Sequence, residues 1–300
     1  MEGARKVIYA ALAGNLAIAG TKFVAAAITG SSAMFSEGVH SVVDTGNQAL
    51  LLYGMRRASR PPDERFPYGH GKEIYFWSFV VALLVFALGA GVSFYQGVQG
   101  LRSPEPMQNP AINYAVLAFA ALFEGGSWLV ALREFRSKKG RRGYLEAVRL
   151  GKDPRTFAVL FEDTAALVGI GVAFLGVALD HLTGNPFFDS AASIVIGVIL
   201  AVTAFLLARE TKGLLIGESA NREVVAEICR LASRYREIAK VHEVLTMHVG
   251  PEFILANIAL EIRPDLPRDR THDIIESLTR DIRRSDDRVK RVFIGLRDED

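Results

Sequence analysis

The stretch FSEGVHSVVDTGNQ, Phe35 to Gln48, places several polar side chains inside an otherwise apolar part of the chain. The residues before it, LAGNLAIAGTKFVAAAITGSSAM, and those after it, ALLLYGM, have the composition of membrane helices. On a helix, His40 and Asp44 are four residues apart and share one face. Because an unpaired imidazole or carboxylate is costly in hydrocarbon, this face must meet protein or water. The pattern predicts either an intramembrane functional site or a structural His–Asp hydrogen bond between packed helices.

Charge is unevenly distributed along the 300 residues, half of which are apolar. Long apolar runs continue to about residue 216, whereas charged residues are dense from Glu218 onward. With a mean hydropathy of +0.22, this segregation predicts a transmembrane domain at 1–216 and a soluble domain at 217–300. A net charge of +2 gives no electrostatic reason to expect a nucleic-acid partner. The single cysteine, Cys229, excludes a disulfide framework or a cysteine metal cluster within one chain.

Six segments have the roughly 20 mostly apolar residues that a transmembrane helix needs. They are rich in Gly, Ala and Ser, which let helices approach closely in a membrane. The basic and then apolar N-terminus starts a segment too long for a signal peptide, so we expect it to be retained. The predicted six-helix, all-α membrane domain consists of residues 7–29, 33–55, 74–100, 111–133, 156–180 and 188–208.

The loops between these segments differ in positive charge. The connection between the second and third segments holds five Lys or Arg, and that between the fourth and fifth holds nine. The other connections hold only Arg102. Since positive loops mark the cytoplasmic side, both termini and the soluble domain are predicted to be cytoplasmic. The compact loops and the lack of a targeting extension favour a multi-pass protein of the bacterial inner membrane over an organellar one.

The soluble part alternates between two kinds of pattern. Residues 221–235 and 270–284 have helical periodicity, whereas residues 241–249, 253–263 and 289–296 alternate as strands. The order α-β-β-α-β in about 80 residues predicts a small α+β domain, ferredoxin-like in element order, with its helices on one face of the sheet.

Three further acids, Glu124, Glu162 and Asp163, fall inside predicted membrane segments. Adjacent residues on a helix point about 100° apart, so one of Glu162 and Asp163 can bind a cation while the other orients it or carries a proton. Alternatively, Glu162 is a solvated acid at a helix start. For Glu124 the sequence allows two roles, a proton relay or an ion-pair partner for Lys22. A divalent cation of the zinc type would take an imidazole nitrogen and carboxylate oxygens as ligands.

Two more groups stand at helix ends. Asp189 is expected to cap the N-terminus of the sixth helix, the alternative being that it attracts cations or lines an exit. In the loop RPPDERFPYGHGK, Asp63 and His70 can meet if the Pro- and Gly-rich chain folds back. Such a pair would either hold a second, weaker ion or, as a structural feature, cap the third helix together with Lys72.

The stretch SSAMFSEGVHSVVDTGNQALLLYG, the later RPPDERFPYGHGKEIYFWS, the six helices and the α-β-β-α-β tail together resemble the cation diffusion facilitator family. The resemblance covers nearly the whole chain. It implies a homodimeric transporter in the lipid bilayer that exchanges a divalent cation, usually Zn²⁺, for protons, with a metallochaperone-like tail that serves for dimerisation. It implies neither an enzyme nor an organic cofactor.

The family's transport site maps by resemblance onto His40 and Asp44 on the second helix and Asp163 on the fifth. The family usually has His-x-x-x-Asp on the fifth helix, but Val159 occupies the histidine position here. The Glu-Asp pair instead resembles the zinc transporter nine-like branch, and Glu162 is the expected substitute for the missing imidazole. A site richer in oxygen admits manganese, iron, cobalt or nickel besides zinc.

The family's cytoplasmic metal sites are only partly matched. Asp63 and His70 match the loop site, although Phe66 stands where relatives often have a second histidine. His242 and His272 match metal-binding positions of the tail. At the positions of the other expected tail ligands, the sequence has Ala259, Gly295 and Arg297. The binuclear metal site of the tail is therefore expected to be degraded or absent.

The resulting function is efflux of a divalent metal cation from the cytoplasm by alternating access coupled to protons. The main alternative is a metal-sensing membrane protein that signals through its cytoplasmic domain, which would need a metal site in the tail. An exporter of organic cations would need an aromatic-lined cavity, but small residues surround the acids. A hydrolytic enzyme would need a nucleophile or metal-bound water beside His40 and Asp44, and the sequence places none there.

Overall fold

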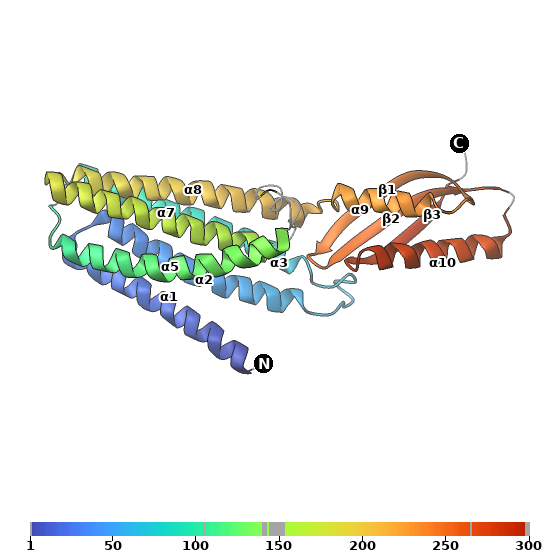
Figure 1. Ribbon diagram of the computed structural model, residues 1–300, viewed down its shortest axis with the longest axis horizontal. Coiled ribbons are helices and arrows are strands. Elements are labelled where there is room, and N and C mark those ends of the chain that lie inside the picture. Colours follow the sequence, from blue (N-terminus) through green and yellow to red (C-terminus); the bar gives the residue numbers. More distant parts are fainter. Residues whose placement is uncertain (1, 105, 140–142, 144–153, 265, 298–300) are drawn as a thin grey trace. The chain divides into compact units, whose positions relative to one another are not determined.

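The computed structural model describes residues 2–104, 106–139, 143, 154–264 and 266–297 (Figure 1). It divides into two compact units. The first consists of residues up to 55 and of 76–211, and the second of 56–75 and residues from 212 onward. The predicted division into a transmembrane domain at 1–216 and a soluble domain at 217–300 stays a prediction.

In its described residues, the regular secondary structure of the first unit consists of helices alone. Its third helix is continuous from Glu73 to Arg102 but includes a π-helical stretch, η1, in the sequence VFALGA. Helices α1, α5 and α7 pack in succession, α1 against α5 and α5 against α7. The helices are α1 Glu2–Thr29, α2 Ser32–Ala58, α3 Glu73–Leu84, η1 Val85–Ala90, α4 Gly91–Arg102, α5 Pro110–Lys139, α7 Pro154–Thr183 and α8 Phe187–Ile216.

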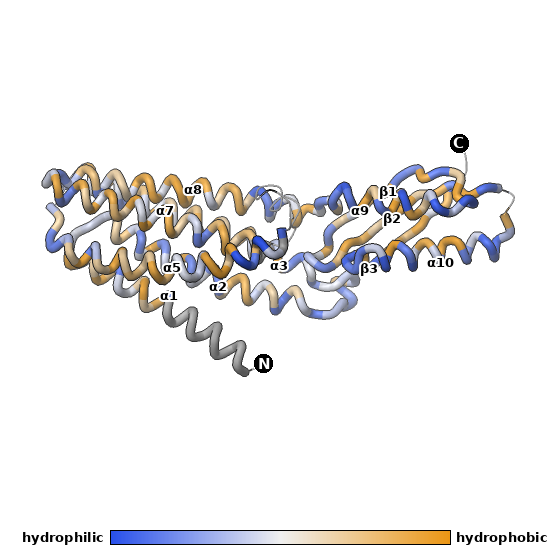
Figure 2. Tube along the Cα trace, viewed as in Figure 1, coloured by the Kyte–Doolittle hydropathy of each residue, from blue (hydrophilic) through white to orange (hydrophobic). Residues whose placement is uncertain are grey.

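Four stretches among the described residues are long and apolar enough to cross a membrane: 73–102, 110–137, 157–183 and 187–216. Figure 2 shows the apolar colour along α5, α7 and α8. Within α1, residues 15–29 are an apolar helical stretch. Helix α2 is not among the four, and it carries the polar residues of the opening stretch. The described part of this unit thus contains six helical segments, but six membrane spans stay a prediction.

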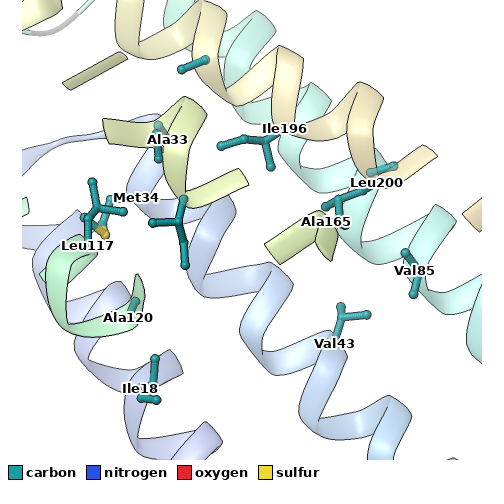
Figure 3. Packing of buried hydrophobic residues seen from close by; sticks show 14 of the residues in the cluster. Ile18, Ala33, Met34, Val43, Val85, Leu117, Ala120, Ala165, Ile196 and Leu200 are labelled. Carbon is teal, nitrogen blue, oxygen red and sulfur yellow. The ribbon is translucent and has the colours of Figure 1, made fainter. Parts of the chain in front are cut away.

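Small residues bring α8 close to its neighbours. A Cβ on Gly197 would lie 3.1 Å from the Ala90 carbonyl oxygen, and one on Gly176 would lie 2.5 Å from the Ala192 Cβ. The helices therefore approach at distances that larger side chains would prevent. The apolar core lies between them and draws on α1, α2, η1, α5, α7 and α8; Figure 3 shows Ile18, Ala33, Met34, Val43, Val85, Leu117, Ala120, Ala165, Ile196 and Leu200.

The N-terminus of α2 is capped by a residue from another helix. Asp189 accepts hydrogen bonds from the Ser31 hydroxyl and the Ser32 amide, both at 2.6 Å, and from the Ala33 amide at 3.3 Å. The prediction that Asp189 caps its own helix is therefore wrong. Helix α8 starts two residues earlier, at Phe187, and the carboxylate instead satisfies the free amides at the start of α2.

The second unit contains the α+β domain. Its three-stranded sheet has the order β1-β2-β3, with β1 (Ile238–Gly250) and β2 (Phe253–Ile262) antiparallel and β3 (Val289–Leu296) parallel to β2. Helices α9 (Arg222–Ala232) and α10 (Arg268–Ser285) complete the predicted α-β-β-α-β order.

Both helices of this domain cover the same face of the sheet, as predicted. Alternate β2 residues, Ile254, Ala256, Ile258 and Leu260, are fully buried and share one core with residues of α9 and α10. The opposite face leaves Phe293 half exposed. The alternation of apolar residues along β2 therefore gives the sheet one buried face and one open face.

Residues 56–75 pack with this domain. Any Cβ on Gly71 would lie 2.6 Å from the carbonyl oxygen of Val249 at the end of β1. The ammonium of Lys72 contacts the Met247 sulfur at 3.9 Å. The loop between α2 and α3 is thus held by close backbone contact, and Gly71 has no side chain to obstruct it.

Candidate functional site

His40 and Asp44 lie on one face of α2, as their spacing predicts. The Nδ1 atom of His40 is 3.4 Å from an Asp44 carboxylate oxygen, and the two side chains are 2% and 13% exposed. The imidazole therefore does not face lipid. Neither ring nitrogen has a hydrogen-bond partner among the described residues, and neither does the neighbouring Asp44 oxygen. A buried polar pair whose donor and acceptor atoms have no protein partner is suited to bind a third group, such as a cation.

The two acids of α7 are directed towards different neighbours. Glu162 accepts a hydrogen bond of 3.2 Å from the side-chain amide of Asn47, three residues after Asp44 on α2. Asp163 accepts one of 3.0 Å from the Ser127 hydroxyl on α5. Both are buried, at 5% and 7% exposure. The alternative of Glu162 as a solvated helix-start acid does not fit this burial.

The acids nevertheless form one electrostatic group. Asp44 interacts electrostatically with Glu162, Glu124 and Asp163, and also with the ammonium of Lys22. Several negative charges therefore gather around one position in the helical unit, which suits a cation.

Within the described residues, no group of three or more His, Cys, Asp or Glu side chains is close enough to hold a metal ion. The transport site of His40, Asp44, Glu162 and Asp163 therefore stays a prediction. The structure brings two of these residues into contact and links α2 to α7 through Asn47.

Lys22 and Glu37 form a buried ion pair that sequence reasoning missed. The ammonium of Lys22 is 3.0 Å from a Glu37 oxygen and donates a 2.8 Å hydrogen bond to Ser41. A lysine in the apolar sequence GTKFVAAA needs a counterion, and the prediction named only Glu124 for this role, although Glu37 lies nearer in the sequence. Among the described residues, Glu124 interacts with Lys22 only electrostatically.

Asp63 and His70 do meet in the loop between α2 and α3. The Nε2 atom of His70 lies 2.9 Å from an Asp63 oxygen, and the Phe66 amide donates to the other oxygen at 2.7 Å. The hydrogen bond from His70, followed by that from Phe66, lowers the pKa of the Asp63 carboxyl below its ordinary value of 3.8. The imidazole is buried, but the carboxylate is about half exposed.

The tail histidines are in different situations. His242 pairs with Glu261 on the adjacent strand at 3.1 Å, whereas His272 lies exposed on α10. Ala259 and Gly295, which replace expected ligands, are directly opposite each other on β2 and β3. No described group at this position could hold a metal ion by itself.

Two other tail residues can be placed. Arg297 continues the pairing of β3, since its amide donates a 2.9 Å hydrogen bond to the Leu260 carbonyl. His248 lies within β1 and is fully buried. It is therefore a sheet residue rather than a surface one.

Comparisons with known proteins agree with this arrangement. A family model described as the cation efflux transmembrane domain matches residues 8–216. The chain is 36% identical over 253 residues to the mitochondrial proton-coupled zinc antiporter SLC30A9 of Mus musculus, which is 83% of this chain and 44% of that protein. The chain thus spans less than half the length of this relative.

Two further similarities cover different shares of the chain. The manganese efflux system protein MneP of Bacillus subtilis is 22% identical over 299 residues, which are 97% of this chain and 95% of that protein. A solved structure of a MamM CTD variant in its cadmium form is 18% identical, covers 26% of this chain and 98% of that chain, and has a TM-score of 0.25. Since the cation efflux model matches more than half of its residues, the chain belongs to this family, the cation diffusion facilitators.

Proposed function

We propose that this protein exports a divalent metal cation from the cytoplasm in exchange for protons. The observation that carries the proposal is the buried His40–Asp44 pair, whose ring nitrogens and facing carboxylate oxygen have no hydrogen-bond partner among the described residues. Burial of these groups without a protein partner is costly, and a metal ion or a proton that binds there during the cycle would offset this cost.

The proposed ligands are His40, Asp44 and Asp163, with Glu162 as a fourth ligand or as the group that orients the others. Support comes from the hydrogen bond that joins Glu162 to Asn47 on α2 and from the electrostatic interaction of Asp44 with both α7 acids. Movement of α2 against α7 would change the distance between the two halves of the site. This provides a simple way to bind the ion in one state and release it in another.

Coupling to protons follows from the ligand chemistry. An imidazole must be neutral and a carboxylate ionised to bind a metal, so metal binding expels protons and protonation expels metal. Reprotonation of the empty site lets it return without carrying several uncompensated charges through a low-dielectric region. The two fluxes are then coupled because neither the empty, fully charged site nor the doubly loaded site crosses readily.

The transported ion is proposed to be zinc, with manganese, iron, cobalt or nickel as other candidates. One nitrogen ligand and several oxygens suit all of these ions, because the site lacks a thiolate. The names of the relatives point the same way, since one is a zinc antiporter and another a manganese efflux protein.

The assembly is proposed to be a homodimer in a bacterial inner membrane, with six spans and cytoplasmic termini. The distribution of Lys and Arg supports the orientation. The alternative, a metal sensor, is not favoured: His242 is paired with Glu261, and the described tail residues form no metal cluster.

The test is metal uptake by proteoliposomes that contain the full chain. With an imposed pH gradient, Zn²⁺ or Mn²⁺ should move against the proton flux. Asp44→Asn should abolish uptake, whereas the control Asp287→Asn removes an exposed carboxylate in the loop before β3 and should not. Normal transport by Asp44→Asn would overturn the site, and transport indifferent to the pH gradient would overturn the antiport.

A further inference from the structure

A polar cavity of about 230 Å³ lies at the end of the helical unit where α1 joins α2, α4 ends and α7 joins α8. Its wall includes Ser32 at the start of α2, Ser103 after α4, and both Asp180 and Asp189. Twelve residues separate Ser32 from Asp44, which is about 18 Å along a helix. The cavity is therefore distinct from the proposed transport site.

Asp180 is the unusual residue in this wall. Its side chain lines the cavity, yet the residue is only 4% exposed. Among the described residues, none donates a hydrogen bond to its carboxylate or forms an ion pair with it. The neighbouring His181 interacts with it electrostatically, but the Nδ1 atom of His181 is 3.4 Å from the Tyr114 hydroxyl. A carboxylate that faces a polar cavity and has no protein partner among the described residues is available to bind a cation there.

Asp189 adds a second negative charge to the same cavity. Its two oxygens are occupied by the Ser31 hydroxyl and by the amides of Ser32 and Ala33, which fix its position. It also interacts electrostatically with Asp180. The Asp189 carboxylate is therefore fixed in position and attracts a cation electrostatically, while the oxygens of Asp180 remain available to bind the cation directly.

The rest of the lining suits a hydrated cation. Gln96, Gln99 and Ser103 contribute neutral oxygen donors, and Met107 contributes a thioether. Among the described lining residues there is no Lys or Arg; Arg102 precedes Ser103 but is not part of the wall. A water occupies about 30 Å³ in the liquid, so 230 Å³ has room for an ion with roughly six waters.

We propose that this cavity is a second cation site, in which Asp180 binds a partly hydrated divalent metal ion and Asp189 adds electrostatic attraction. That the site lies near the exit of the transport path rests on the proposed function. Binding of the cation at the site does not depend on it. With one direct carboxylate ligand and retained water, its dissociation constant should be on the order of 10⁻⁴–10⁻³ M. Such weak binding suits a site that must release its ion.

The test measures binding at the cavity itself, in the full chain in detergent micelles with Mn²⁺ alone as the probe. The only cysteine is removed by Cys229→Ser, and Ser103→Cys places a thiol in the cavity wall. Millimolar Mn²⁺ should slow the reaction of this thiol with a maleimide at least about 5-fold. A matched Thr183→Cys thiol, exposed and outside the lining, should react at an unchanged rate.

Asp180→Asn should shift the Mn²⁺ concentration for half protection at least about 10-fold upward, while Asp180→Glu should retain protection. Retained protection in Asp180→Asn, no protection in the parent, or equal protection of the Thr183→Cys thiol would each overturn the proposal. Water or a proton alone in the cavity would give the second of these results.

The same measurement in Asp44→Asn separates this inference from the proposed function. Protection that persists there supports a separate site, whatever that variant does to transport. Protection that disappears would mean that the thiol responds to ion binding at Asp44, and the second site would be rejected. Transport that persists in Asp44→Asn would reject the proposed transport site while leaving the cavity measurement valid.

Discussion

Among the described residues, the His70–Asp63 and His40–Asp44 pairs differ in how far their polar atoms are hydrogen-bonded within the protein. In the loop, His70 and Asp63 are 2.9 Å apart and hydrogen-bonded, and Phe66 donates to the second carboxylate oxygen. On α2, His40 and Asp44 are 3.4 Å apart, and neither imidazole nitrogen has a hydrogen-bond partner among the described residues. The same two residue types thus form a hydrogen-bonded pair in the loop, where only the Nδ1 atom of His70 lacks a partner among the described residues, and an open pair on α2. The loop pair is called the closed pair below.

The difference follows from backbone geometry. A loop with prolines and glycines can fold an acid back onto an imidazole, so the pair reaches ordinary hydrogen-bond distance. On a helix, the spacing of four residues sets both side chains on one face, where they project side by side towards a third group. The open pair is therefore suited to share a ligand, and the closed pair to hold a loop in shape.

The largest expected effect concerns the buried Lys22–Glu37 ion pair, in which each charge has a partner, unlike the open His40–Asp44 pair. Lys22→Met should lower the free energy of unfolding by about 3–5 kcal/mol, because it leaves the Glu37 carboxylate buried without a counter-charge. Thermal unfolding in detergent would measure it. The double variant with Glu37→Gln should recover most of the loss. A single variant as stable as the parent would mean that burial without a partner is tolerated here, and the comparison would lose its basis.

The next effect separates the two pairs directly. His40→Ala should reduce metal uptake by proteoliposomes at least ~100-fold, since it removes a ligand, whereas His70→Ala should reduce it less than ~10-fold. Initial rates at saturating Zn²⁺ would measure both, with dimer content as the control for folding. Equal losses from the two variants would remove the functional distinction between the pairs.

A smaller effect sharpens the description of the open pair. Asn47→Ala removes the hydrogen bond that orients Glu162, and loss of such a supporting group typically costs about 10-fold or more in metal affinity. The KM for Zn²⁺ should rise while the maximal rate changes less. A fall in maximal rate at constant KM would instead assign Asn47 to the conformational change.

The smallest effect is a protonation equilibrium in the closed pair. Because its hydrogen bond with His70 lowers the Asp63 pKa, the pair contributes stability above the ordinary value of 3.8 and loses it as pH falls through the lower, folded-state value. Carboxyl ¹³C NMR should show Asp63 titrating below 3.8 in the parent and closer to 3.8 in His70→Ala. An unchanged titration would place the cause in the Phe66 amide instead.

The sequence predicted much of the fold because its patterns are local. Alternation along residues 253–263 indicated a strand with one buried face, and the burial of Ile254, Ala256, Ile258 and Leu260 follows that period. The placement of His40 and Asp44 on one face of α2 was equally predictable, since a spacing of four residues on a helix determines it.

What could not be predicted involves contacts between distant residues. Asp189 looked like the cap of its own helix, but its nearest free amides belong to α2, 156 to 157 residues earlier in the chain. The pairing of Lys22 with Glu37 rather than Glu124 depends likewise on which helices pack together. The π-helical stretch at Val85–Ala90 has no clear sequence signal beyond its glycine and apolar residues.

The close approach of Gly71 to the Val249 carbonyl has a practical consequence for shortened forms of the protein. Deleting everything after residue 216 would also strip the partner surface from residues 56–75, which pack with the tail domain. The Asp63–His70 turn would then lose its support, and the ends of α2 and α3 with it. Loss of transport in such a deletion would therefore report on the connecting loop as well as on the tail, and point substitutions on the open sheet face near Phe293 are the cleaner way to examine the tail alone.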